Sequence, residues 1–247
     1  MIVTHSMTLL IAVAVLVVLL IVLQWMKRGT LNQLQRFGTP RLIYLSAFIG
    51  VPIHELSHAF FCLVFGHKIT SISLLQFDGT DTLGYVGHRY NSRNLYHQCG
   101  RFFIGIAPVV GGLSSVLILT VFLFPSIDTS QLLKPPLLYD TRAMSDMLSF
   151  HQQMWQQDHL KYAIWLFATA SILSHITPSK SDLEGATYGA LFITIITAGI
   201  YGLNSEWLSW SAHVVWGALS ILISCFLAVV LLHVALLMIG RLVSIVR

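Results

Sequence analysis

The sequence predicts an all-α polytopic membrane protein of about six transmembrane helices, with a small β-hairpin after the second helix. Of its 247 residues, 55% are hydrophobic and only 10% are charged, whereas soluble domains carry about 25% charged residues. The apolar residues also fall into runs long enough to cross a lipid bilayer, which takes about 20 residues. We therefore expect one membrane-embedded domain over residues 1–247. The small net charge of +4, with no basic tract, argues against nucleic-acid binding.

The apolar runs give the order of the predicted helices. They cover residues 7–26, 42–65, 102–124, 162–176, 183–203 and a stretch within 211–239. The first run has no basic segment before it and no small-residue cleavage site after it, which favours a retained helix over a signal peptide. Positive charges divide evenly between the two sides of the membrane, so charge alone does not orient the chain. Small size and the lack of organelle signals favour a prokaryotic inner membrane.

Residues 67–100 interrupt the helical pattern. Residues 69–75 alternate apolar and polar side chains as a strand does, residues 77–81 have turn composition, and residues 84–88 form a second candidate strand. These features predict a β-hairpin, with a surface loop of hairpin character as the alternative. The exposed edge of such a hairpin can pair with an extended peptide.

Two other segments have a distinctive composition. Gly105–Gly112 is rich in small residues, which favours close packing between helices, and Pro108 can kink the helix there. Residues 144–157, within the long polar segment 125–160, are amphipathic enough for a helix at the membrane interface. The three cysteines, Cys62, Cys99 and Cys225, are scattered and predict neither a disulfide framework nor a cysteine-based metal site.

The second predicted helix carries the sequence His54-Glu55-Leu56-Ser57-His58 at mid-length. Side chains four residues apart lie on nearly the same face of a helix, so both imidazoles can bind one Zn²⁺. Glu55 points about a quarter turn away and can act on water at the metal. Ionisable groups are costly at this depth in a membrane, which favours a functional role over hydrogen bonding within the bundle.

A zinc site of this kind needs a third protein ligand, and two acidic residues at the start of the fifth predicted helix are candidates. Ser181 and Glu184 fit a capping box, which would give Glu184 a structural role. Asp182 has no such role in this pattern, so we expect Asp182 as the third ligand and keep Glu184 as the alternative. His175 has two interpretations. It can act at the site, as a ligand, a support for a ligand or an oxyanion stabiliser, or it can be a buried histidine bonded to a backbone carbonyl. The buried histidine is slightly favoured.

The zinc motif in a hydrophobic helix, the hairpin, the small-residue run and the later acidic motif resemble the site-2 protease family of intramembrane zinc metalloproteases. The resemblance covers residues 42–205 and implies a metalloprotease core there, with residues 7–26 and 211–239 as accessory helices. Within the acidic motif, Leu183-Glu184-Gly185 is similar to the family's Leu-Asp-Gly form and favours Glu184. The Ser-x-x-Asp form that ends at Asp182 resembles divergent members of the same clan.

The resemblance implies an enzyme, a zinc metalloendopeptidase that hydrolyses peptide bonds of membrane-anchored protein or peptide substrates. Its cofactor would be Zn²⁺, its catalytic residue Glu55, and its metal ligands His54, His58 and Asp182. The family's zinc site faces the cytosolic side, which implies cytoplasmic termini. The alternative is a non-proteolytic metal-binding membrane protein, such as a transporter, a sensor or an inactive protease-like scaffold. Polar residues clustered in two places argue against a transporter, and the intact Glu55 argues against an inactive scaffold.

Overall fold

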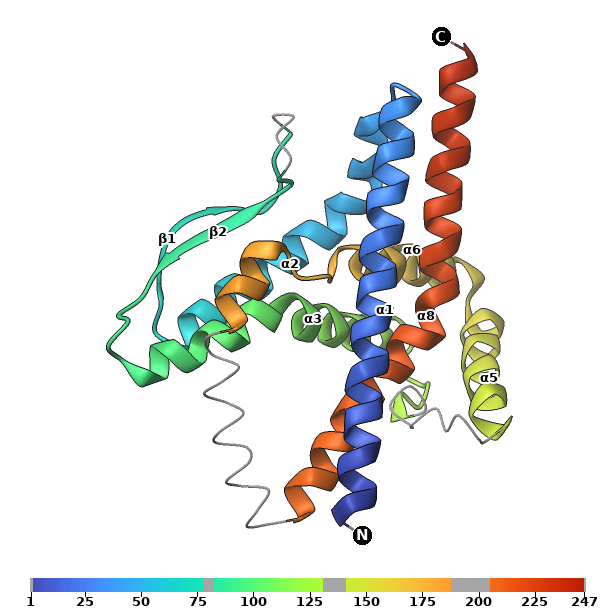
Figure 1. Ribbon diagram of the computed structural model, residues 1–247. Helices are drawn as coiled ribbons and strands as arrows, with labels where there is room; N and C mark the ends of the chain where they lie inside the picture. The colour runs from blue at the N-terminus through green and yellow to red at the C-terminus, as the bar shows by residue number, and fades with distance from the viewer. Residues whose placement is uncertain (1, 78–81, 131–140, 188–204, 247) are drawn as a thin grey trace. The chain divides into compact units, whose positions relative to one another are not determined.

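The computed structural model describes residues 2–77, 82–130, 141–187 and 205–246 (Figure 1). This part of the chain is mainly helical, with one two-stranded sheet. In chain order the elements are α1 (Ile2–Arg36), η1 (Pro40–Ile43), α2 (Tyr44–Val64), β1 (Lys68–Ser73), β2 (Tyr85–Arg89), α3 (Leu95–Leu123), α5 (Thr141–Gln157), α6 (His159–His175) and α8 (Ser205–Val246). The prediction of a helical protein with a small hairpin is confirmed.

Four helices within the described ranges are long and apolar enough to cross a membrane. They lie at Leu10–Arg36, Pro40–Val64, Leu95–Leu123 and Val214–Val246. The predicted helix at 162–176 falls in α6, which has 17 residues, and most of the predicted helix at 183–203 lies outside the described residues. The structure thus agrees with the expected membrane protein, while the count of six spans stays a prediction.

The chain divides into two compact units, so the single domain over 1–247 also stays a prediction. One unit comprises Met1–Leu42, Val116–Ala170 and Leu203–Arg247, and the other comprises Ile43–Ser115 and Ser171–Gly202. In the first unit α1 packs along α8, and Gly240 of α8 allows a close approach, because a Cβ there would lie 2.6 Å from Leu34 Cδ2. The second, called the hairpin unit below, contains every candidate site residue.

The sheet of the hairpin unit is an antiparallel hairpin that packs on α2. Lys68 lies opposite Arg89 and Ser73 opposite Tyr85, with a register shift between Ile69 and Ser71. Figure 1 shows β1 and β2 running side by side as a twisted ribbon. Each strand of a two-stranded sheet has one paired edge and one edge open to a further strand.

The glycines of α3 bring it close to its neighbours. A Cβ on Gly111 would overlap the Ser57 hydroxyl of α2, and one on Gly105 would lie 2.5 Å from the Asp182 carbonyl oxygen and 2.7 Å from Ala186 Cβ. This is the close packing that small residues permit between helices. It also means that α3 holds the backbone of Asp182 in place.

We expect Gly105→Ala to lower the free energy of unfolding by about 1–3 kcal/mol, because the added methyl overpacks against main-chain atoms. The matched control is Gly185→Ala on the neighbouring segment, where a Cβ would meet nothing within 4 Å. That change should be neutral or stabilise the helix by up to about 1 kcal/mol. Unfolding of the purified protein in mixed micelles, followed by circular dichroism, measures both. Equal effects of the two substitutions would show that α3 does not pack as described.

Candidate metal centre

His54 and His58 lie one turn apart on α2, and their Nε2 atoms are 3.2 Å apart. Asp182 approaches from the helical segment 180–187, the unlabelled orange helix in Figure 1. Its Oδ1 lies 3.4 Å from His58 Nε2 and its Oδ2 lies 3.9 Å from His54 Nε2. Two nitrogens bound to one zinc ion at 2.0–2.1 Å in tetrahedral geometry are about 3.3 Å apart. The three groups are therefore spaced as ligands of one ion.

Both imidazoles are oriented by main-chain carbonyls. His54 Nδ1 donates to the carbonyl oxygen of His175 at 2.6 Å, and His58 Nδ1 donates to that of Ile104 at 2.8 Å. Because a carbonyl only accepts, each Nδ1 carries a proton, and each neutral ring presents an unprotonated Nε2. Metal-binding histidines commonly donate their other ring N–H in this way. The two Nε2 lone pairs and the Asp182 carboxylate converge on one point. A cation bound at that point would be stabilised by all three groups.

The two carbonyls are ones that their own helices cannot use. His175 is the last residue of α6, and the last carbonyls of a helix lack an intrahelical partner. Ile104 lies four residues before Pro108 in α3, and proline has no N–H to donate to that carbonyl. Pro108 thus frees an acceptor for His58. The sequence already indicated that Pro108 lies in this helix. The rule that a helical proline leaves the carbonyl four residues earlier without a partner would have identified Ile104 as an acceptor.

Asp182 is held by a capping box, and the prediction of which residues form this box was wrong. The Ser179 N–H donates to Asp182 Oδ2 at 2.7 Å, and the Asp182 N–H donates to Ser179 Oγ at 3.3 Å. The helix begins at residue 180, so Ser179 is the N-cap and Asp182 is the third helical residue. The sequence contains two overlapping copies of the capping-box pattern, one that starts at Ser179 and one that starts at Ser181. Only the folded chain shows which serine begins the helix.

Glu184 lies outside the His54–His58–Asp182 group. Its side chain is 68% exposed and lies 3.7 Å from Lys180 Nζ, one turn earlier on the same helix. Of the two acidic candidates, Asp182 is the one that the structure brings to His54 and His58. The cap at Ser179 engages Oδ2 of Asp182 and leaves Oδ1 facing His58.

Glu55 is 6% exposed and lies beneath the start of β2. A Cβ on Gly84, the residue before β2, would lie 2.9 Å from Glu55 Cγ and 2.9 Å from Val51 Cγ1. A glycine is therefore needed for the hairpin to pass this close to α2. The sequence showed Gly84 only as part of a candidate strand, and nothing local to it indicated contact with a residue 29 positions earlier.

His175 is buried, and its ring does not join the candidate ligands His54, His58 and Asp182. Its Nε2 lies 3.2 Å from Ser46 Oγ, and the Ser46 hydroxyl donates to the carbonyl of Ile43 at 3.0 Å. The contribution of His175 to the site is its carbonyl, which orients His54. This is a supporting role carried by the backbone.

A cavity lies beside Asp182, and its polar lining includes His88, Arg101 and Ser181. Burial lowers the pKa of His88, and the neighbouring His67 lowers it further. The His88 ring is therefore neutral at pH 7. The cavity gives a small space with both polar and apolar lining next to the carboxylate that faces the two histidines.

The fold and the site define a membrane-helical protein with a His-His-Asp group spaced for a metal ion. In comparisons with known proteins, no family model, no curated protein and no solved structure matches the chain. The similarity to the site-2 protease family stays a prediction from the residues.

Proposed function

We propose that the protein is a membrane-embedded zinc metalloendopeptidase that hydrolyses peptide bonds of membrane-anchored proteins within or beside the bilayer. One observation carries the proposal. Three donor groups spaced for one ion lie beside the buried carboxylate of Glu55. Glu55 is on α2, which is itself long and apolar enough to span a membrane. A group that only binds metal has no need of that carboxylate. Six spans, cytoplasmic termini and a prokaryotic inner membrane belong to the same proposal.

The residues present fit a zinc ion. His54 and His58 would hold it through Nε2 and Asp182 through its carboxylate, a set of nitrogen and oxygen ligands that zinc accepts while keeping a position for water. Bound zinc supplies a Lewis acid that acidifies water and polarises a peptide carbonyl. The carbonyls of His175 and Ile104 keep both rings in the ligating tautomer, and Ser179 keeps the carboxylate in place.

Glu55 moves the proton. As a carboxylate it accepts a proton from the attacking water, whose oxygen forms a bond to the peptide carbonyl carbon. It then gives that proton to the leaving nitrogen as the C–N bond breaks, so that a carboxylic acid and an amine result. Positioned acid–base groups contribute typically 10²–10⁴-fold to a rate. The hairpin above Glu55 limits the access of bulk water to this carboxylate.

The hairpin is the proposed substrate platform. A transmembrane helix hides its amides in internal hydrogen bonds, so a spanning substrate must unwind locally before it can be cut. An unwound segment can add to an open edge of the β1–β2 sheet as a third strand, which satisfies its backbone groups. Gly84 brings this sheet into contact with Glu55, so an added strand would be delivered near the metal centre.

The test is cleavage of a single-span peptide that carries a fluorophore and a quencher on either side of a glycine-rich segment, reconstituted with the protein in liposomes. We expect cleavage that falls to background when 1,10-phenanthroline removes the metal and returns when zinc is restored. Cleavage that survives complete removal of the metal would contradict the proposal. Zinc-loaded protein that moves zinc into the liposomes without cleaving the peptide would favour a transporter.

A further inference from the structure

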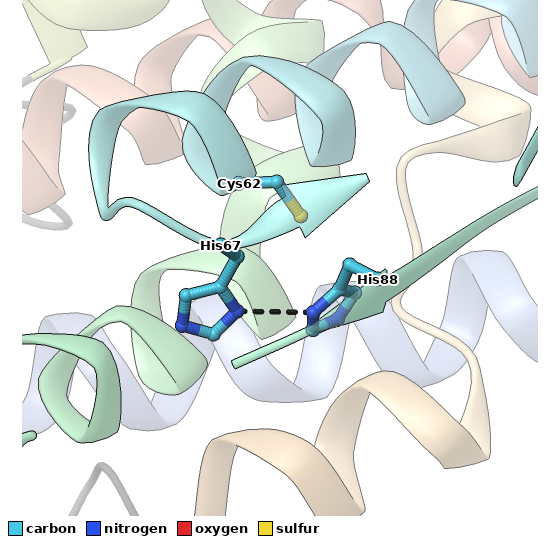
Figure 2. Close-up of side chains that lie close together, drawn as sticks. All are labelled: Cys62, His67 and His88. Atoms are coloured by element: carbon cyan, nitrogen blue, oxygen red, sulfur yellow. Dashed lines mark hydrogen bonds between the residues drawn. The ribbon is translucent and has the colours of Figure 1, made fainter. Parts of the chain in front are cut away.

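A second group of metal-binding side chains lies in the hairpin unit, and the proposed mechanism does not use it. It consists of Cys62, His67 and His88, which Figure 2 shows facing one another. One donor atom from each side chain lies within 4.8 Å of the others, and Cys62 and His67 are buried. The sequence predicted no cysteine-based metal site, because no recognised ligand spacing links these residues.

Local backbone geometry brings Cys62 and His67 together. α2 ends in a Schellman motif, in which the His67 N–H donates to the Cys62 carbonyl at 2.8 Å and the Gly66 N–H donates to that of Leu63 at 3.2 Å. Gly66 adopts φ 69°, the left-handed conformation that this motif requires. The motif places side by side the two residues whose bond spans five positions of the chain, here Cys62 and His67, and these are usually a hydrophobic pair. Here that pair is a thiol and an imidazole.

Strand register adds His88. His67 directly precedes β1, and Ile69 of β1 lies opposite His88 of β2. The two rings meet with their Nδ1 atoms 3.0 Å apart, the contact drawn as a dashed line in Figure 2. Two nitrogens that share one zinc ion are about 3.3 Å apart. The hairpin thus sets the second imidazole at the spacing of a ligand pair.

The hydrogen bonds of His67 leave its inner nitrogen available. Its Nε2 donates to the carbonyl of His97 at 2.9 Å, so in the neutral ring Nδ1 carries a lone pair that faces His88. The Tyr90 ring stacks on His67 with centroids 5.0 Å apart and fixes the plane of the imidazole. His54 and His58 show the same arrangement, in which one ring nitrogen donates to a main-chain carbonyl and the other presents its lone pair to the neighbouring ligand groups.

We propose that Cys62, His67 and His88 form a second metal site that binds Zn²⁺ through one thiolate and two Nδ1 atoms. Thiolate and imidazole are ligands that zinc accepts readily. The bound ion would tie the end of α2 to β2. Because Gly84 lies against Glu55 just before β2, the same link would hold the hairpin in register over the first site. The proposal does not depend on whether the protein is a protease.

Cobalt substitution of the purified full-length protein in detergent separates the two sites. A thiolate bound to Co²⁺ gives a sulfur-to-metal charge-transfer band in the near ultraviolet, and the His54–His58–Asp182 group has no sulfur. We expect one Co²⁺ for each of the two groups and one such band. Cys62→Ser should remove the band and one equivalent of cobalt, and His88→Ala should weaken binding at this site by about 10–100-fold or more.

Two controls make the assignment specific. Cys99→Ser alters a cysteine outside the group and should leave the band unchanged. His58→Ala should remove one equivalent of cobalt and keep the band, so failure at the first site is distinguishable from failure at the second. Wild-type protein that shows no charge-transfer band at saturating Co²⁺ would overturn the proposal without reference to any variant. A band that persists in Cys62→Ser would also overturn it.

Discussion

Glu55→Gln is expected to lower the rate of peptide cleavage by about 10²–10⁴-fold and to leave the metal content at the wild-type level. The amide has nearly the same shape as the carboxylate, so the contact with Gly84 is kept. It cannot accept the proton from water, so the step that the proposed mechanism gives to Glu55 is lost. The measurements are the cleavage rate of the quenched single-span peptide and the zinc content by mass spectrometry.

Glu184→Gln is the matched control, because it makes the same chemical change at a carboxylate whose side chain is 68% exposed. It should leave both the rate and the zinc content unchanged. A Glu55→Gln protein that cleaves at the wild-type rate would remove Glu55 from the mechanism. Membrane proteomes compared between cells with wild-type protein and cells with Glu55→Gln would then reveal natural substrates as intact proteins that accumulate.

Loss of the Asp182 carboxylate is expected to weaken zinc binding at the first site by at least about 10–100-fold, because even supporting residues of metal sites have effects of that size. Asp182→Asn is the preferred variant. Its side-chain oxygen can still accept from the Ser179 N–H, so the capping box is kept while the negative charge is removed. Glu184→Ala should leave zinc affinity unchanged. Competition with a fluorescent zinc chelator measures both affinities.

The second site allows an internal check on this experiment. The thiolate–cobalt band of the Cys62 group should be the same in Asp182→Asn and in the wild type, which would show that the hairpin unit is still folded. Loss of zinc in Glu184→Ala, with wild-type affinity in Asp182→Asn, would instead make Glu184 the third ligand.

Ser179→Ala should lower the free energy of unfolding by about 1 kcal/mol through loss of the cap, with the candidate metal ligands all present.

Much of the first site could be read from local sequence. His54 and His58 lie on one face of α2 because a helix has 3.6 residues per turn, and this spacing does not depend on the rest of the chain. Alternation and turn composition predicted strands at residues 69–75 and 84–88 in the same local way, and the structure has them at Lys68–Ser73 and Tyr85–Arg89. The apolar runs likewise indicated helices suited to a bilayer, since length and hydrophobicity are properties of a segment alone.

The capping of the acidic motif shows where local reasoning fails. The capping-box pattern fits two pairs, Ser179 with Asp182 and Ser181 with Glu184. Which pair forms the box depends on where the chain leaves α6 and turns. That turn is set by packing, since Gly105 of α3 lies against the Asp182 carbonyl. A capping box therefore turned out to orient the candidate ligand.

The sequence by itself determined the membrane-helical class, the hairpin and the His54-Glu55-x-x-His58 group, because each is set by periodicity within one segment. Only the tertiary structure decided that Asp182 meets this group, that carbonyls freed at Pro108 and at the end of α6 orient its rings, and that Cys62 and His67 meet His88. The physical reason is the same in each case. These contacts join atoms distant in sequence, and helix packing and strand register, which no single segment encodes, set their distances.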